Sequence, residues 1–520
     1  MYRSVWTGMK VWIEKNQYFT FLFKITLLML LLGIDLGTSS IKVSVVDAQS
    51  QSCLVSVQYP DSETPIETPH PGWAEQSPDM WWDHVQQAIK KANASGKYNP
   101  ADIGAIGIAY QMHGLVMVDK NQNVLRPSII WCDSRAVEIG DKAFAAIGEE
   151  KCLSHLLNSP GNFTASKLAW VKANEPAVYE KADKIMLPGD YISMKLTGEI
   201  NSSISALSEG IFWDFAEDRL SRDVLSYYGI DQNLLPAVQP LFSSHGQLKE
   251  AVAKSLSLRP GIPVSYKAGD QPNNALSLNV LNPGEVAATA GTSGVIYGVS
   301  DKLAYDPQSR VNSFAHVNYM PGDKRIGILL CINGTGIMNR WIRSITGSTL
   351  SYPEINLEAA SVQAGSAGLQ ILPFGNGAER MLNNKMPGAS MRGLDLNVHS
   401  RAHLYRAVQE GLVFSFRYGL DILRENGMQP KVIRAGSANM FLSDLFTNIF
   451  VNTTGTPVEL FNGDGSVGAA LGSGIGAGIF KEPREAFQHF TPLKMVEPNG
   501  KLEYEEFYQN WKRVLQREIA

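Results

Sequence analysis

The chain has 520 residues, of which 44% are hydrophobic and 18% charged, and its net charge is −4. A chain of this length exceeds one hydrophobic core, so at least two large domains are expected. No run of Lys or Arg stands out, which argues against nucleic acid or an anionic membrane as a partner. The four cysteines lack metal-ligand spacing and are typical of reduced thiols in a cytoplasmic protein: Cys53, Cys132, Cys152 and Cys331.

Residues 1–28 precede the first recognisable strand. The stretch 18–34 is largely apolar and follows basic residues, which resembles a signal peptide. Lys24 interrupts this stretch, however, and no small-residue cleavage site precedes Leu30. Met29 would be a natural start just before the strand. We therefore expect residues 1–28 to lie outside the fold and expect no attachment to a membrane.

The first pair of strands surrounds an acid and a small-residue turn. An apolar strand over 30–34 ends at Asp35, and Gly37, Thr38 and Ser39 lead into an alternating strand over 41–45. Glycine lets the backbone approach a ligand closely, and successive N–H groups in such a turn form a concave anion site. Asp35 could hold a hydrated Mg²⁺ beside bound phosphates. An ordinary hairpin with an acidic turn is the alternative.

A similar hairpin follows about 250 residues later. The strand 286–290 leads into Gly291, Thr292 and Ser293, and a second strand covers 295–297. Two such hairpins in one chain indicate duplicated halves that face each other across a nucleotide and bind its phosphates from both sides.

Polar residues follow a buried strand over 103–109, after a helix that begins at Ser77-Pro78. They are Gln111, Met112 and His113. An amide and an imidazole at a strand end can hydrogen-bond sugar hydroxyls, and such a site rejects analogues that lack the hydroxyl. A buried histidine with methionine as core filler is the alternative reading.

The strand 262–266 leads to Gly269-Asp270, and a small-residue helix is expected over 272–281. Phosphoryl transfer needs a carboxylate that orients an acceptor hydroxyl and takes its proton, and Asp270 is the best candidate. A helix N-cap is the alternative role for Asp270. A long helix from Ser400 to near Gly427 and a glycine- and alanine-rich segment over 463–478 follow. Strands that alternate with helices predict an α/β fold.

Together these segments resemble the FGGY family of carbohydrate kinases, which are actin-like ATPases, from about Met29 to about Gly478. The two hairpins match the phosphate hairpins of the family, and 111–114 matches the sugar-site motif of members that phosphorylate D-xylulose. Residues 131–135 fit a Trp-x-Asp-x-Arg element, and 390–410 resemble the C-terminal signature.

The resemblance implies two ribonuclease-H-like domains with a cleft between them. Residues 29–268 would form the sugar-binding N-terminal domain and 269–520 the nucleotide-binding C-terminal domain. The implied reaction is Mg²⁺- and ATP-dependent phosphorylation of D-xylulose to D-xylulose 5-phosphate in the cytoplasm, by a possible homodimer.

By the same resemblance, Asp270 is the catalytic base and Asp35 organises Mg²⁺. The sugar would contact Gln111, Met112, His113, Asp270 and Gln271. The phosphates would lie on Gly37, Thr38, Ser39, Gly291, Thr292 and Ser293, and the adenine against Gly436, Ser437 and Asn439.

Arg434-Ala435-Gly436-Ser437 departs from the glycine run that such members often have, and Gln271 stands where many have Asn. Three alternatives remain open: a kinase for another ketose, a polyol or a sugar acid; a catalytically silent actin-like sugar sensor; and a filament-forming or chaperone-like ATPase.

Overall fold

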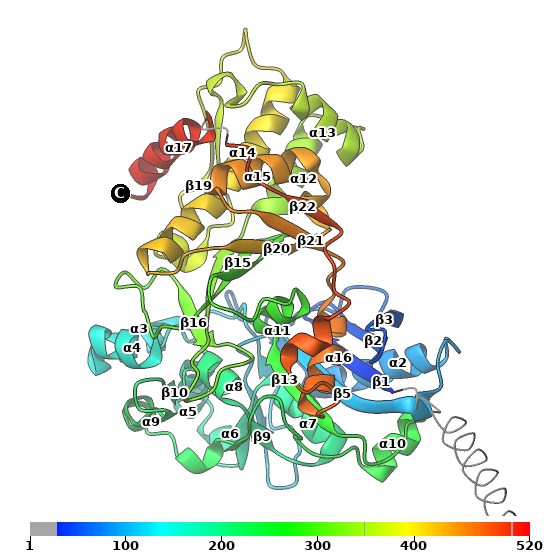
Figure 1. Cartoon of the computed structure of the whole chain (residues 1–520). Coiled ribbons are helices and arrows are strands. Elements are labelled where there is room, and N and C mark those ends of the chain that lie inside the picture. The colour runs from blue at the N-terminus through cyan, green and yellow to red at the C-terminus, as the bar shows by residue number, and fades with distance from the viewer. Residues whose placement is uncertain (1–28, 348, 501–502) are drawn as a thin grey trace, which may run out of the picture.

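The computed structural model describes residues 29–347, 349–500 and 503–520. The expected extension 1–28 therefore lies outside the described residues. Two α/β bodies, each built on one sheet, lie one above the other in Figure 1. Among the helices of the described residues, none combines the length and the apolar character that crossing a bilayer requires.

The first body contains a five-stranded sheet in the order β13-β5-β1-β2-β3. Strands β1 and β2 are antiparallel, as are β2 and β3, whereas β5 and β13 run parallel to β1 and to each other. The expected strands around Asp35 and over 103–109 are confirmed. The strand bounds are Leu30–Leu36 (β1), Ile41–Asp47 (β2), Cys53–Tyr59 (β3), Ile103–Tyr110 (β5) and Val264–Gly269 (β13).

The second sheet repeats this topology. Its inner strands have the order β17-β15-β14-β20-β21, with the same alternation of antiparallel and parallel pairs. Strands β16 and β22 extend its two edges. The predicted α/β fold with two ribonuclease-H-like halves is confirmed. The bounds are Glu285–Ala290 (β14), Gly294–Ser300 (β15), Asn312–Ala315 (β16), Ile326–Ile332 (β17), Val432–Gly436 (β20), Val458–Phe461 (β21) and Lys494–Val496 (β22).

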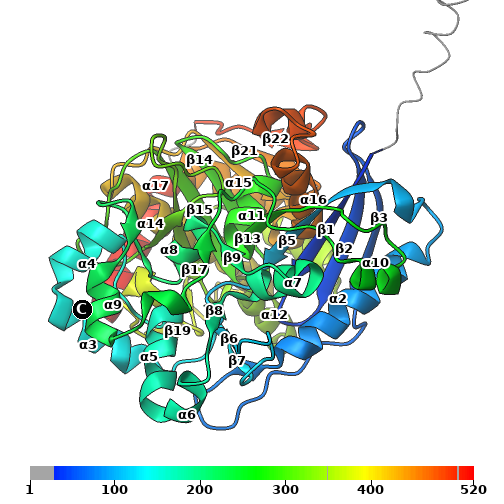
Figure 2. The ribbon, with the colours of Figure 1, turned by 90° about the horizontal axis from the view of Figure 1, so that it is seen from below.

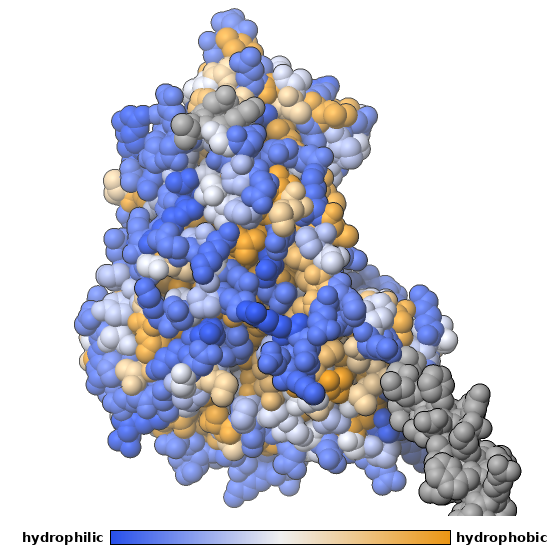
Figure 3. All heavy atoms as spheres, in the orientation of Figure 1, coloured by the Kyte–Doolittle hydropathy of each residue, from blue (hydrophilic) through white to orange (hydrophobic). Residues whose placement is uncertain are grey.

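Helices cover both sheets. In the first body they include α2 (Pro78–Asn93), α3 (Val137–Ile147), α4 (Glu149–Leu156), α5 (Thr164–Asn174), α7 (Pro188–Thr197), α8 (Ile204–Glu209), α9 (Arg222–Tyr228) and α10 (Glu250–Leu256). In the second they include α12 (Thr335–Ile345), α13 (Tyr352–Ala360), α14 (Arg401–Glu425), α15 (Asp444–Thr454) and α17 (Glu503–Ile519). The Ser77 side chain accepts the Met80 N–H and caps α2, as expected. The face seen in Figure 3 is mainly hydrophilic with scattered apolar side chains.

Two helices connect the halves. Helix α11 (Asp270–Ser277) follows β13 directly and begins two residues earlier than expected, whereas α16 (Gly465–Gly476) follows β21. Although α16 belongs to the part of the chain assigned to the second domain, it packs on β1 and β5 of the first sheet (Figure 1). Figure 2 shows α16 and α2 on opposite faces of that sheet. The domain boundary at 268/269 stays a prediction.

Glycines allow α16 to lie close to the strands. A Cβ atom at Gly33 would lie 1.8 Å from the Ser466 carbonyl oxygen, and one at Gly107 would lie 1.9 Å from that of Ala469. Backbone atoms cannot move aside as a flexible side chain can, so no larger residue fits at either position. The glycine- and alanine-rich segment thus packs closely on the first sheet.

We expect Gly33→Ala to lower the free energy of unfolding by about 3 kcal/mol, because overpacking of this kind forces the backbone apart. Gly322→Ala is the matched control, since a Cβ atom there meets nothing within 4 Å. Urea unfolding of both variants measures the difference. Equal stability of the two variants would contradict the close contact between β1 and α16.

Candidate active site

The candidate catalytic acid and the candidate metal ligand share one cavity. Asp35 lies in β1 near its end and Asp270 is the first residue of α11, so both face the space between the two bodies. The cavity has a volume of about 220 Å³. It receives residues from both halves, which are Asp35, Asp270, Gln271, Asn273, Asn274, Thr289, Val295 and Gly465.

Asp270 is not the N-cap of α11. Gly269 occupies that position, and no side chain caps the helix, so the alternative role considered for Asp270 is wrong. Burial and the nearby charge of Asp35 raise the pKa of Asp270 to about 7. Burial and the nearby charge of Asp464 raise the pKa of Asp35 to about 6. The cavity therefore concentrates carboxyl groups whose ionisation the surroundings oppose.

Asp464 is an acidic neighbour that the sequence analysis did not single out. It is the N-cap of α16 and accepts the Ser466 N–H. Burial opposes its ionisation, but hydrogen bonds from Ser466 and the charge of Lys42 outweigh that effect and hold the pKa of Asp464 below its ordinary value. A Cβ atom at Gly465 would lie 2.4 Å from Asp35 Oδ2, so the start of α16 touches this carboxylate.

The first hairpin turn lies beside this cluster. The Gly37 N–H donates to the carbonyl oxygens of Asp35 and Ser40, whereas the N–H groups of Thr38 and Ser39 have no protein acceptor among the described residues. The Thr38 hydroxyl donates to Gln111 Oε1 at 3.1 Å. The turn is thus linked to the proposed sugar residues.

The second hairpin and the proposed adenine loop lie next to each other. The Gly291 carbonyl oxygen accepts the Gly336 N–H and the Thr335 hydroxyl at the start of α12. Asn439 is close by, since its Nδ2 would lie 3.5 Å from a Cβ atom at Gly291. The N–H groups of Thr292 and Ser293 have no acceptor within the described part of the chain.

The proposed adenine loop has an unusual sequence, and it leaves free space beside Gly436. A Cβ atom at Gly436 would meet nothing within 4 Å, and the Ser437 N–H donates to the Phe461 carbonyl oxygen of the neighbouring strand. The Arg434 side chain pairs with Glu459 and Glu285. Arg434 is therefore held by carboxylates of its own sheet.

The proposed sugar residues form the other side of the site. Gln111 Nε2 donates to the buried Gln76, and Met112 packs beside Gly269, next to Asp270. His113 has a left-handed backbone with a φ angle of 62°, and its ring contacts those of Phe163 and Phe314. Burial and the charge of Lys167 lower the pKa of His113 to about 3, so its imidazole is neutral.

Two residues near His113 were missed by the sequence analysis. Glu209 is buried at the end of α8 and accepts the His113 N–H. Arg380 comes from the second body, and its guanidinium lies 5.4 Å from the centre of the Phe163 ring in the first body. Neither belongs to a motif or a periodic pattern, so no sequence signal marks them.

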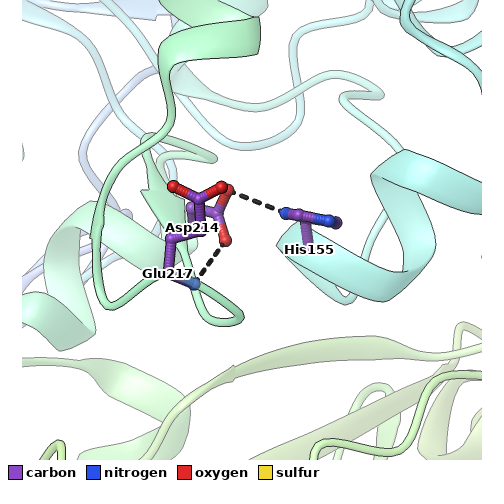
Figure 4. A group of neighbouring side chains, drawn as sticks. All are labelled: His155, Asp214 and Glu217. Atoms are coloured by element: carbon purple, nitrogen blue, oxygen red, sulfur yellow. Dashed lines mark hydrogen bonds and ion pairs between the residues drawn. The ribbon is translucent and has the colours of Figure 1, made fainter.

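A second group of potential metal ligands lies apart from the cavity. His155, Asp214 and Glu217 place one ligand atom each within 4.8 Å of one another (Figure 4). Asp214 Oδ2 contacts His155 Nδ1 at 2.9 Å, and Asp214 Oδ1 accepts the N–H groups of Ala216 and Glu217. Glu217 also pairs with Arg219. These contacts stabilise a turn, and we assign no metal to them.

Two ribonuclease-H-like halves around a carboxylate-lined cavity define an actin-like phosphotransferase. A model of the N-terminal domain of the FGGY family of carbohydrate kinases matches residues 30–277, and a model of the C-terminal domain matches 286–478. The chain belongs to the FGGY family of carbohydrate kinases and is a sugar kinase.

Proteins named as sugar kinases match nearly the whole chain. It is 29% identical over 468 residues to the xylulose kinase of Escherichia coli (strain K12), covering 90% of this chain and 93% of the relative. The crystal structure of xylulose kinase from Rhodospirillum rubrum has a TM-score of 0.84 at 25% identity and covers 94% of this chain and 98% of its own. Gluconate kinase from Lactobacillus acidophilus shares the fold, with a TM-score of 0.85, 22% identity and coverage of 95% and 99%.

We expect Asp35→Asn to stabilise the metal-free protein at alkaline pH. Because the pKa of Asp35 is raised from 3.8 to about 6, the folded state keeps a proton that the unfolded chain has lost. The stability linked to this group is full at low pH and is lost as the pH rises to about 6. Urea unfolding at pH 5 and pH 8 without divalent cations should show a larger gain at pH 8.

The exposed carboxylate of Asp301 provides the control, because Asp301→Asn should change stability little at either pH. If Asp35→Asn is less stable than the unaltered protein at pH 8, the surroundings stabilise the ionised form of Asp35, which contradicts its raised pKa.

Proposed function

We propose that this protein transfers the terminal phosphoryl group of ATP to D-xylulose and forms D-xylulose 5-phosphate. The observation that carries the proposal is the position of Asp270, which lines the cavity between the halves and directly follows Gly269, the residue that packs against Met112 of the 111–113 segment. The similarity to proteins named xylulose kinase supports this choice of acceptor. A cytoplasmic location and a homodimer stay predictions.

Asp270 acts as the general base. Its raised pKa of about 7 suits a group that accepts a proton near neutral pH. As Asp270 takes the proton of the acceptor hydroxyl, that oxygen bonds to the γ-phosphorus and the bond from this phosphorus to the bridging oxygen of ADP breaks. The proton thus ends on Asp270 and the negative charge on ADP.

The two hairpin turns bind the phosphates. Thr38, Ser39, Thr292 and Ser293 each have an N–H group free of protein acceptors within the described residues, and such groups bind phosphate oxygens. They approach from opposite halves, and Gly436, Ser437 and Asn439 lie where an adenine could extend from the second turn. The N–H of Gly37 is already hydrogen-bonded, so its contribution would be to let the backbone come close to the phosphates.

The acidic cluster fits a magnesium ion. The charge of Asp35 opposes the ionisation of Asp270, and the charge of Asp464 opposes that of Asp35. Three carboxyl groups together form the oxygen-rich donor set that Mg²⁺ prefers. Asp35 would hold the ion. When bound, Mg²⁺ supplies positive charge that neutralises phosphate oxygens.

The chemistry of the acceptor explains a polar sugar site. In the furanose form of D-xylulose the oxygen on carbon 5 closes the ring, so only the open-chain ketose offers this hydroxyl. Gln111 and the neutral imidazole of His113 supply hydrogen-bonding groups to orient such an extended molecule, with Gln271 beside the base. Buried polar groups left unpaired by a smaller polyol would weaken its binding.

A sugar acid is the second candidate. Arg380 donates to Ser309 but forms no ion pair with a carboxylate in the described part of the chain. Burial lowers the pKa of its guanidinium to about 10, so an anion would stabilise its charged form. This observation favours gluconate over an uncharged acceptor.

ADP release from MgATP tests the proposal with D-xylulose, L-xylulose, D- and L-ribulose, glycerol and gluconate. We expect the highest kcat/KM with D-xylulose. A preference for gluconate would replace the proposed acceptor and support the role of Arg380, whereas sugar-independent ATP hydrolysis alone would refute transfer to a sugar.

We expect Asp270→Asn to lower kcat by about 1,000-fold, since a positioned base contributes about 100- to 10,000-fold. ATP should still bind, because the hairpin turns are intact, and isothermal titration measures this separately. In the unaltered enzyme, kcat should rise with pH as Asp270 loses its proton, with a midpoint at or below pH 7 when Mg²⁺ is bound. A kcat of Asp270→Asn within tenfold of the unaltered enzyme would rule out this base.

A further inference from the structure

Glu209 is a buried residue next to the proposed sugar-binding segment. It ends α8, which packs beside β13 in the first body (Figure 1). Only 1% of the residue is exposed. A buried carboxyl group is unusual, because burying an unpaired charge costs free energy.

Glu209 holds His113 at two points. Its Oε1 accepts the His113 N–H at 3.1 Å, and its own carbonyl oxygen lies 3.1 Å from His113 Nδ1. Because His113 is neutral, Nδ1 carries the proton and donates to this carbonyl, which leaves Nε2 as an acceptor. The first contact also fixes the left-handed backbone of His113, a conformation that a non-glycine residue adopts at a cost.

The other oxygen of Glu209 reaches the catalytic turn. A Cβ atom at Gly269 would lie 2.6 Å from Glu209 Oε2 and 2.6 Å from Met112 Cγ. Gly269 immediately precedes Asp270. One carboxyl group therefore contacts the segment proposed to bind the sugar and the residue that leads into the proposed base.

We propose that Glu209 is a positioning residue, which sets His113 and the Gly269-Asp270 turn at a fixed separation so that the sugar hydroxyl meets the base. This inference rests on the proposed function, since it assumes a sugar between His113 and Asp270. Glu209 acts through these two neighbours and does not touch the reacting atoms.

The surroundings require Glu209 to be neutral. Burial raises its pKa well above the ordinary value, and the charges of Asp270 and Asp190 raise it further. Since Oε1 accepts a hydrogen bond, the proton lies on Oε2, with the Tyr110 hydroxyl beside the carboxyl group. The titratable and charged groups around it are Asp270, Asp190, His113, Tyr110, Tyr297 and Lys167.

Neutrality matters for the base. An ionised Glu209 would add a negative charge near Asp270 and oppose the ionisation that catalysis needs. A neutral carboxylic acid supplies the acceptor for His113 without this charge. Glutamine has the same shape and also offers an oxygen acceptor without charge, which makes it the informative replacement.

Steady-state kinetics of Glu209→Gln and Glu209→Ala test the proposal, with Glu217→Gln as the control on an exposed carboxylate. We expect Glu209→Gln to keep the sugar KM within about threefold, and Glu209→Ala to raise it about tenfold, the equivalent of one lost hydrogen bond. The KM for ATP should change less than twofold in both variants. If Glu209→Gln is as impaired as Glu209→Ala, or if Glu209→Ala leaves the sugar KM unchanged, the proposal is wrong.

The pH dependence separates positioning from a purely structural role. In the unaltered enzyme the sugar KM should rise at alkaline pH as Glu209 ionises, and in Glu209→Gln this rise should be absent. An identical rise in both proteins would overturn the proposal. This comparison needs only the glutamine variant and therefore decides the matter even if Glu209→Ala does not fold.

A readout without a sugar distinguishes failure of this inference from failure of the proposed function. The ¹⁵N spectrum of imidazole-labelled protein reports the tautomer of His113, with His113→Asn to assign its signal. We expect the Nδ1-protonated form in the unaltered protein and in Glu209→Gln. If this form is absent from the unaltered protein, Glu209 does not set His113, whichever sugar the enzyme phosphorylates.

Discussion

The contact between α16 and the first sheet is the constraint on which the site depends. Glycines on the strands and on the helix remove the side chains that would separate them, as at Gly33 on β1 and at Gly472, where a Cβ atom would lie 2.8 Å from the Tyr266 ring. The contact fixes where α16 begins. Its first residue, Gly465, therefore lies against Asp35, and the Asn273 side chain of α11 donates to its carbonyl oxygen. A shift of the helix would move the edge of the cavity itself.

This arrangement places carboxyl groups where their ionisation is opposed. A core selected only for stability would contain no such cluster, because each buried carboxylate makes the ionisation of its neighbours less favourable. Perturbed carboxyl groups in a cavity are typical of functional sites, where a ligand supplies the missing positive charge. The same reasoning applies to Arg380, a half-buried cation whose charge acts on His113 and whose own pKa is lowered by burial, despite the nearby charges of Glu379 and Asp141.

Sequence patterns were sufficient for features that arise within a few residues. The turn after Asp35, the cap of α2 by Ser77 and the strand that leads to Asp270 each follow from local spacing. The α/β class was predicted from such segments, whereas the two ribonuclease-H-like domains were predicted from the family resemblance. Glu209 lies 96 positions from His113 in the chain. Gly269, which Glu209 also contacts, lies at the end of another strand, β13. Such contacts depend on how α8 packs on β13, which no periodicity specifies. Asp464 was missed for a similar reason, since only the crossing of α16 brings it to Asp35.

The duplicated topology places the residues of the cavity at equivalent positions of the two halves. When Gly37 and Gly291 are matched in the two hairpins, Asp35 corresponds to Thr289, and both line the cavity. Strands β13 and β21 occupy the same place in the two sheets, and each leads into a helix whose start bears an acid, Asp270 in one half and Asp464 in the other. The two halves therefore present equivalent positions to one ligand, yet only the first hairpin carries a carboxylate. This asymmetry supports the proposal that the carboxylate of the first hairpin holds the metal, whereas the second hairpin binds nucleotide phosphates through its backbone N–H groups.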